Sequence, residues 1–202
     1  MRRLSPAALS LLVAITPWIG VAPVEAASSR IAFSVGNRGG PLGLAAMHPN
    51  GDERRPLTDE HDSSPRFSPD GRMIAFLRDA DAAADLFVAS AHGRNARSLV
   101  RMHSTFDPYC RSFDWSPDST RLVVSAEDRS GGDCDLFVVG LDGSVTPLVE
   151  DETTNWDPQW SPDGGAIAFV ADDPVEETLD VYSVPSDGGD PMRLTTDPDE
   201  DF

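Results

Sequence analysis

The chain of 202 residues carries 34 carboxylates against 16 basic side chains, all of them arginine, so its formal net charge is −18. So acidic a protein repels phosphate backbones and anionic lipid, and the composition therefore argues against nucleic-acid binding. The charge is compatible with calcium, with a basic partner or with solubility alone.

Residues 1–27 have the pattern of a signal peptide. Two arginines precede an apolar run over residues 7–22, and the sequence VEA at residues 24–26 fits the small-x-small rule for cleavage just after it. A membrane anchor is the alternative, but the run is short for a bilayer span and contains Pro17. We therefore expect a periplasmic or secreted protein whose mature part, residues 28–202, is not inserted in a membrane.

Four copies of one unit of about 45 residues follow, at about 30–62, 63–109, 110–156 and 157–202. Each copy has an apolar strand, a second strand, a turn with a residue–glycine pair and then a leucine. The apolar strands are RIAFSV from Arg30, MIAFLR from Met73, RLVVSA from Arg121 and AIAFVA from Ala166. The leucines are Leu57, Leu99, Leu148 and Leu194. The constant order of these features predicts a repeat fold.

Three copies of a Ser-Pro-Asp turn join a short first strand to the apolar strand. Proline pre-sets the second position of a β-turn, and glycine accepts a left-handed φ. We therefore assign a structural role to Ser68, Pro69, Asp70 and Gly71, to Ser116, Pro117 and Asp118, and to Ser161, Pro162, Asp163 and Gly164. Ser119 replaces the glycine of the second turn, where backbone strain or a different turn type should result.

Pro56 and Pro147 fall in the last strand of their units, which should be an outer edge because proline cannot donate to a ladder. Each unit is thus predicted to be a four-stranded antiparallel sheet, with the length and strand count of a β-propeller blade. The stretch DPQWSPDGGAIAFV…DVYSVPSDGGDPMRLT, within residues 157–195, resembles the WD40-like repeat of TolB-type propellers. Such repeats occur in exported bacterial proteins and as accessory domains of bacterial enzymes. The resemblance covers about residues 30–202 and implies a fold rather than a function.

The predicted ring is unfinished. The first unit begins at its second strand, and the chain ends in LTTDPDEDF, before another first strand. We therefore expect an all-β fold of propeller-type blades, about three and a half to four of them, in an open ring. The resemblance implies more blades than this, and TolB carries an N-terminal α/β domain with no counterpart in this sequence. Open blade faces should expose apolar strands, which favours self-association; a truncated gene product is an equal alternative.

Loops that enter the first strands share one face with loops between the second and third strands, and both loop classes are rich in carboxylates, among them Asp62. Aromatic residues lie among these acids. The sequence therefore predicts a partner-binding face with Asp107, Tyr109, Trp156 and Asp157 as candidate residues. Calcium binding is a second hypothesis, but the acids are too loosely spaced for a dedicated calcium loop, so no metal site and no cofactor is assigned. Loop aspartates also cap turns, which requires no partner.

Cys110 and Cys134 are the two cysteines of the chain, and an even count in an exported protein favours a disulfide. Both fall in the loop classes of the candidate face; two free thiols are the alternative. The sequence has no Gly-x-Ser-x-Gly nucleophile motif, and its four histidines lie singly, so no catalytic residues are assigned.

These patterns favour an exported, non-catalytic propeller module that mediates protein–protein interaction. A second hypothesis is the accessory propeller of a peptidase-like or polysaccharide-active enzyme, separated from its catalytic part. A third is a degenerate product without a function.

Overall fold

The computed structural model describes residues 30–37, 40–80, 83–102, 110–127, 133–173 and 178–195. Over these ranges the chain forms four antiparallel β-sheets and no helix, which confirms the predicted all-β class. These ranges contain no helix that is long and apolar enough to cross a membrane. The expected signal peptide lies outside the described residues.

Within each sheet the strands follow one another in chain order. The first sheet consists of β1 (Ile31–Asn37), β2 (Gly40–Met47) and β3 (Arg55–Pro56). The second consists of β4 (Asp62–Phe67), β5 (Met73–Ala80), β6 (Ala83–Ser90) and β7 (Arg97–Met102). The third consists of β8 (Phe113–Trp115), β9 (Arg121–Glu127), β10 (Cys134–Gly140) and β11 (Val145–Val149). The fourth consists of β12 (Asn155–Trp160), β13 (Ala166–Asp173), β14 (Thr178–Pro185) and β15 (Met192–Arg193).

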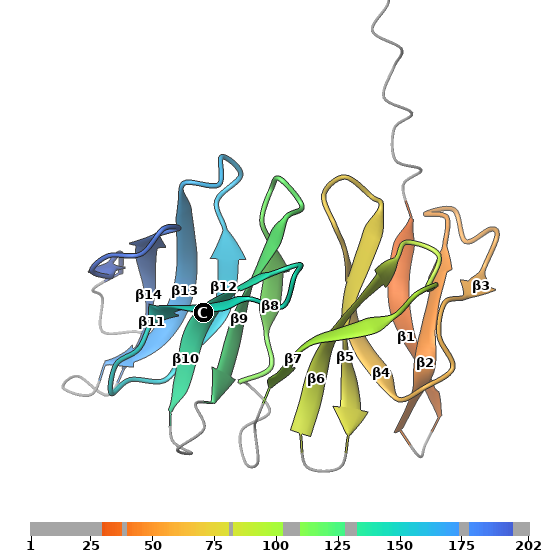
Figure 1. Cartoon of the computed structure of the whole chain (residues 1–202), viewed down its shortest axis with the longest axis horizontal. Coiled ribbons are helices and arrows are strands. Elements are labelled where there is room, and N and C mark those ends of the chain that lie inside the picture. Colours follow the sequence, from red (N-terminus) through yellow and green to blue (C-terminus); the bar gives the residue numbers. More distant parts are fainter. Residues whose placement is uncertain are drawn as a thin grey trace, which may run out of the picture.

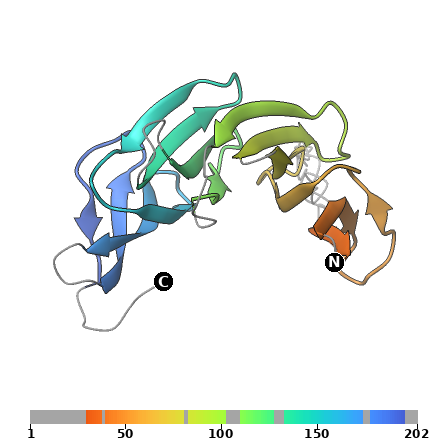
Figure 2. The ribbon, with the colours of Figure 1, turned by 90° about the horizontal axis from the view of Figure 1, so that it is seen from below.

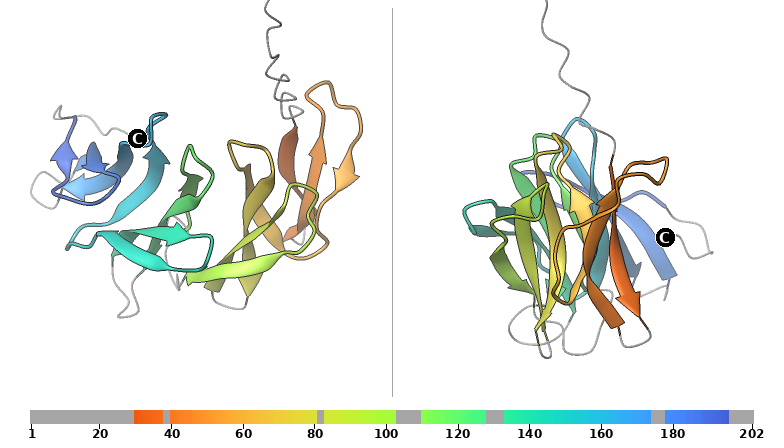
Figure 3. Two further views of the ribbon diagram at one scale, coloured as in Figure 1. Left: turned by 45° about the horizontal axis from the view of Figure 1, so that its top comes forward. Right: turned by 90° about the vertical axis from the view of Figure 1, so that its right-hand side faces the viewer.

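The four sheets stand side by side and form an open arc, with the first sheet at one end and the fourth at the other (Figures 1 and 2). Seen along the arc, they lie one behind another (Figure 3). The last strand of each sheet is an edge strand, so Pro56 and Pro147 occupy edge positions as predicted. The described part of the chain is thus a set of blades in an open ring.

The hydrophobic core is divided among the gaps between neighbouring sheets. Ile74 in β5 packs toward the first sheet, against Leu44 and Leu57, whereas its neighbour Ala75 belongs to the cluster between the second and third sheets. Because both faces of a middle sheet are covered, its strands are apolar at successive positions instead of alternating.

An aromatic residue ends the first strand of the second, third and fourth sheets and lies between two sheets. Phe67, Trp115 and Trp160 each belong to the apolar cluster that their sheet shares with the preceding one. The indole Nε1 of Trp115 also donates to the backbone oxygen of Arg66 in that preceding sheet, at 3.0 Å. Equivalent residues of the repeat therefore occupy equivalent places in the arc.

The three Ser-Pro-Asp turns share one set of hydrogen bonds. In the first, the Ser68 hydroxyl donates to Asp70 Oδ1 (2.6 Å) and accepts from the Met73 N–H (3.0 Å), and Asp70 Oδ1 accepts from the Arg72 N–H (3.0 Å). The turns at Ser116 and Ser161 repeat this pattern. Each turn is closed by its own side chains.

These bonds should make the fold sensitive to acid. They hold the pKa of Asp70, Asp118 and Asp163 below the ordinary value, the serine hydroxyl contributing most. A carboxyl whose pKa is lower in the folded chain stabilises the fold above its unfolded value of about 3.9, and this contribution is lost as the pH falls through the folded value. We expect Asp70→Asn/Asp118→Asn/Asp163→Asn to lose less stability than wild type between about pH 5 and pH 2, measured by denaturant unfolding. An equally steep loss in both proteins would contradict this.

The second turn has the same closed form with Ser119 in the place of glycine, although the left-handed backbone conformation of this serine is strained. Its φ is 61°, and its N–H donates to the Ser116 oxygen at 2.8 Å as in the other turns. The buried Ser119 hydroxyl accepts from the Asp70 N–H of the neighbouring sheet at 3.1 Å. Glycine has no side chain with which to join two blades in this way.

Ser119→Ala should lower the free energy of unfolding by about 1 kcal/mol, because it removes the hydrogen bond and keeps the left-handed φ. Ser119→Gly loses the same bond but relieves strain of about 1 kcal/mol, so its stability should lie close to that of wild type. Urea titration of the three proteins measures the difference. A glycine variant no more stable than the alanine variant would mean that strain at this position is unimportant.

Candidate partner-binding face

The first strands of the second, third and fourth sheets (β4, β8 and β12) begin at one end of the blades, drawn at the bottom of Figure 1. Here a disulfide joins Cys110, just before β8, to Cys134, the first residue of β10, with 5.5 Å between their Cα atoms. Both cysteines are buried. The bond ties the entry of the third sheet to its third strand, with β9 between them.

Removal of this disulfide should destabilise the protein. The bond closes a loop of 24 residues, for which loop entropy predicts a contribution of about 3 kcal/mol. We expect Cys110→Ser/Cys134→Ser to unfold at a correspondingly lower urea concentration. A reductant should lower the midpoint of wild type and leave that of the variant unchanged; a reductant effect on both proteins would contradict the assignment.

Trp156 and Asp157 lie at the start of β12, in different environments. Trp156 is half-buried and pairs with Val170, whose neighbours Phe169 and Ala171 pack toward the third sheet. Trp156 therefore lies on the opposite side of the fourth sheet. Asp157 is exposed, has a φ of 48° and lies within a β-bulge, where its N–H donates to Ser112 Oγ at 3.0 Å.

The loop before β12 is organised by carboxylates. Asp151 Oδ1 accepts from the Thr153 N–H at 2.9 Å and from Asn155 Nδ2 at 3.1 Å. Thr154 bonds to Asp172 through its N–H and to Asp133 through its hydroxyl, at 3.3 Å for the second. These acids therefore position the loop beside Trp156. The described residues include no group of three or more histidine, cysteine, aspartate or glutamate side chains that could hold a metal ion.

Asp62 is not part of an exposed acidic loop, contrary to the expectation from the sequence. It is the first residue of β4, its side chain is 0% exposed, and both its oxygens accept from Arg78, at 2.7 Å from Nε and 3.0 Å from Nη2. Its partner explains its burial, since a bidentate guanidinium replaces the water that the carboxylate has lost.

Two other predicted residues of this face, Asp107 and Tyr109, lie outside the described residues. Two pockets lie elsewhere among the described residues. One of about 250 Å³ lies between the third and fourth sheets, near Arg121 and Leu148, and one of about 290 Å³ lies on the first sheet. Neither of these two pockets includes Trp156 or Asp157 among its lining residues.

No protein-family model matches the sequence. The uncharacterized peptidase YuxL of Bacillus subtilis is 28% identical over 165 residues, covering 61% of this chain and 24% of that protein. The chain thus spans about a quarter of this curated relative.

Solved structures match over most of the chain. The putative TolB of Agrobacterium tumefaciens matches with a TM-score of 0.68 and 21% identity, over 82% of this chain and 61% of that one. The β-propeller domain of the trilobed protease of Pyrococcus furiosus, whose topology is described as open velcro, matches with a TM-score of 0.62 and 17% identity, over 82% and 54%. The chain therefore has the fold of the TolB-type β-propellers.

Proposed function

We propose that the protein is an exported, non-catalytic β-propeller module that binds a protein partner through the face carrying Trp156 and Asp157. The observation that supports this most is the half-buried Trp156 beside the exposed Asp157, on a strand whose entry loop is held by hydrogen bonds. Tryptophan dominates the binding energy of many protein interfaces, and carboxylates around it favour a partner with a basic surface. Asp107 and Tyr109 are proposed to belong to the same face.

Export is supported by two features. The pattern of residues 1–27 is that of a signal peptide, and the Cys110–Cys134 disulfide is of a kind that persists in oxidising compartments such as the periplasm. The proposal requires no cofactor.

Affinity capture from an envelope extract tests the proposal. Wild type should retain a specific protein, and Trp156→Ala should lose at least nine-tenths of it while folding normally. Val145→Ala is the matched control, because Val145 is an exposed apolar residue, at 46%, on the edge strand β11. Equal capture by both variants would refute the assigned face, and no capture by wild type would refute the binding role.

The similarity to YuxL favours a second candidate, in which the chain is the accessory propeller of a peptidase-like protein. In that case the reading frame, or a neighbouring frame, would continue downstream into further blades or into a hydrolase sequence with a Gly-x-Ser-x-Gly motif. Sequencing the DNA on the 3′ side of the Phe202 codon decides between the two candidates.

A further inference from the structure

Neighbouring sheets pack through the same interface three times. We call the side of a sheet toward the preceding sheet its front face and the other side its back face. Back faces contribute a leucine that packs against the next sheet: Leu57, Leu99 and Leu148. Front faces contribute a fully buried aliphatic residue near the start of the second strand: Ile74, Leu122 and Ile167.

The outermost faces of the first and fourth sheets present the same positions to solvent. Ile31 takes the place of the front-face residues and is 44% exposed, whereas Ile74 is 0% exposed. Leu194 takes the place of the back-face leucines and is 50% exposed. Met192, 61% exposed, pairs with Ser183 on the same face. Within the described residues, no sheet lies against the front face of the first sheet or the back face of the fourth, at the two ends of the arc in Figure 2.

The two ends also differ in charge. Residues 30–102 carry ten arginines and nine carboxylates, whereas residues 103–202 carry four arginines and twenty-four carboxylates. At the front face of the first sheet, the Arg54 guanidinium lies 5.6 Å from the centre of the Phe33 ring. At the fourth sheet, Asp187 and Asp190 are exposed. Residues 30–102 are thus close to neutral and residues 103–202 strongly acidic, so the attraction between the two ends is local, between the Arg54 guanidinium and the carboxylates of the fourth sheet.

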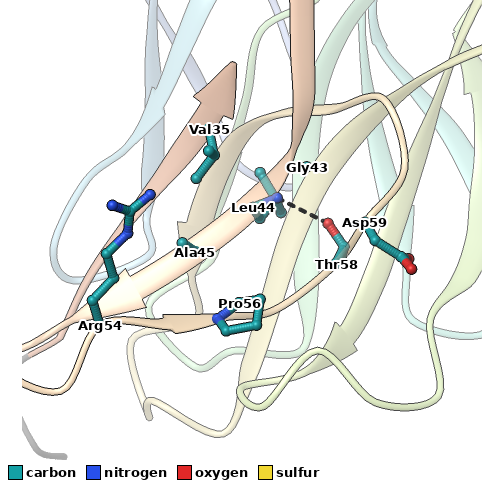
Figure 4. Close-up of a pocket in the computed structure, with 8 residues that line it drawn as sticks. All are labelled: Val35, Gly43, Leu44, Ala45, Arg54, Pro56, Thr58 and Asp59. Atoms are coloured by element: carbon teal, nitrogen blue, oxygen red, sulfur yellow. Dashed lines mark hydrogen bonds between the residues drawn. The ribbon is translucent and has the colours of Figure 1, made fainter. Parts of the chain in front are cut away.

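A second group of arginines lies where the first sheet meets the second and is not part of the front face. Arg55 donates to the Ala91 backbone oxygen of the second sheet at 3.5 Å, and its positive charge is the main cause that lowers the pKa of the exposed His92. The pocket of about 290 Å³ lies beside the front face, with Val35, Ala45, Pro56 and Arg54 among its lining residues (Figure 4). Thr58 and Asp59 line the pocket as well, so its wall carries one guanidinium and one carboxylate around an apolar recess that suits an apolar side chain.

We infer that a second copy of this chain docks head to tail, with the front face of its first sheet on the back face of the fourth sheet. This contact between two molecules has the same form as the contact between neighbouring sheets within one molecule. It joins two different surfaces, so each copy keeps one face free, and association either closes a ring or continues as a chain. Trp156 lies on the same side of the fourth sheet, but the contact is assigned to Leu194, Met192 and Ile31 and does not depend on the proposed function.

Sedimentation velocity of protein expressed from the full chain tests this inference across the micromolar range. Wild type should reach at least twice the mass of one chain. Leu194→Arg and Ile31→Arg should each remain monomeric. An equimolar mixture of these two variants should form a dimer, because each supplies the face that the other lacks. Val145→Arg, equally exposed on an edge strand, should associate like wild type.

A wild type that is monomeric at every concentration overturns the inference, and so does a Leu194→Arg variant that behaves like Val145→Arg. A mixture that stays monomeric overturns the head-to-tail arrangement. Met192→Arg repeats the test at a residue that is 61% exposed, in case Leu194→Arg perturbs folding. Capture of a different protein by monomeric Leu194→Arg would show that partner binding is separate from self-association.

Discussion

Asp62→Ala should lower the free energy of unfolding by about 3 kcal/mol, because it leaves the Arg78 guanidinium without its main counter-charge in a largely buried position. The Asp62 side chain is 0% exposed and that of Arg78 is 16% exposed. Arg78 also lies 4.3 Å from the centre of the Phe87 ring, so it cannot leave the site without losing a second contact. Glu60, at 2.9 Å from Arg78, remains in the variant and limits the loss.

The matched control for this prediction is Asp85→Ala. Asp85 pairs with Arg101 at 3.2 Å, but the Arg101 side chain is 57% exposed, so the change should cost less than about 1 kcal/mol. Asp62→Ala/Arg78→Met should recover part of the stability lost by Asp62→Ala, since no unpaired charge is left. Denaturant unfolding at neutral pH measures all three variants. Similar losses for Asp62→Ala and Asp85→Ala would show that burial of the first pair has little energetic effect.

Trp115→Ala should cost about 3 to 5 kcal/mol, the range expected for removal of a large aromatic side chain from a core. Trp115 is 4% exposed and lies in the apolar cluster between the second and third sheets. Its loss would open a cavity where two blades meet and would remove the hydrogen bond to the Arg66 oxygen. Both effects weaken the same contact between blades.

A comparison of two conservative variants separates packing from hydrogen bonding. Trp115→Phe leaves the Arg66 oxygen without its indole donor, which should cost about 1 to 2 kcal/mol beyond the lost area. The buried Nε1 of Trp160 has no hydrogen-bond partner among the described residues, so Trp160→Phe removes an unsatisfied donor and should cost less. Thermal and denaturant unfolding of both variants test this order. A larger loss for Trp160→Phe would show that packing alone distinguishes the two positions.

The architecture was predictable because its signals are local and repeated. The Ser-Pro-Asp turns place each first strand against its second strand. Pro56 and Pro147 indicate edge strands, because proline has no N–H to donate to a neighbouring strand. The candidate site was predictable only in part. The strand order of a blade predicts that the loops containing Cys110 and Cys134 lie at the same end. By contrast, no feature of the sequence around Trp156 indicates that its side chain lies on the side of the fourth sheet away from the third sheet.

The burial of Asp62 was missed because it depends on a bulge. Phe67 pairs with Ile74 and Arg66 with Ala75, and an unbroken ladder would place Ser63 opposite Arg78. The register shifts between Ser63 and Arg66, where Ser64 has a φ of 50°, and Asp62 pairs with Arg78 instead. A pattern that assumes regular pairing cannot find this ion pair.

By itself, the sequence determined that the chain forms repeated four-stranded units in chain order, because turn residues and apolar runs act over a few neighbouring positions. The tertiary structure alone decided which carboxylate is buried, which side of a sheet Trp156 occupies, and that Ile31 and Leu194 are exposed while their equivalents are covered. These outcomes depend on the register shift at a bulge and on whether another sheet packs against the residue. Equivalent positions of the repeat therefore differ in burial along the arc.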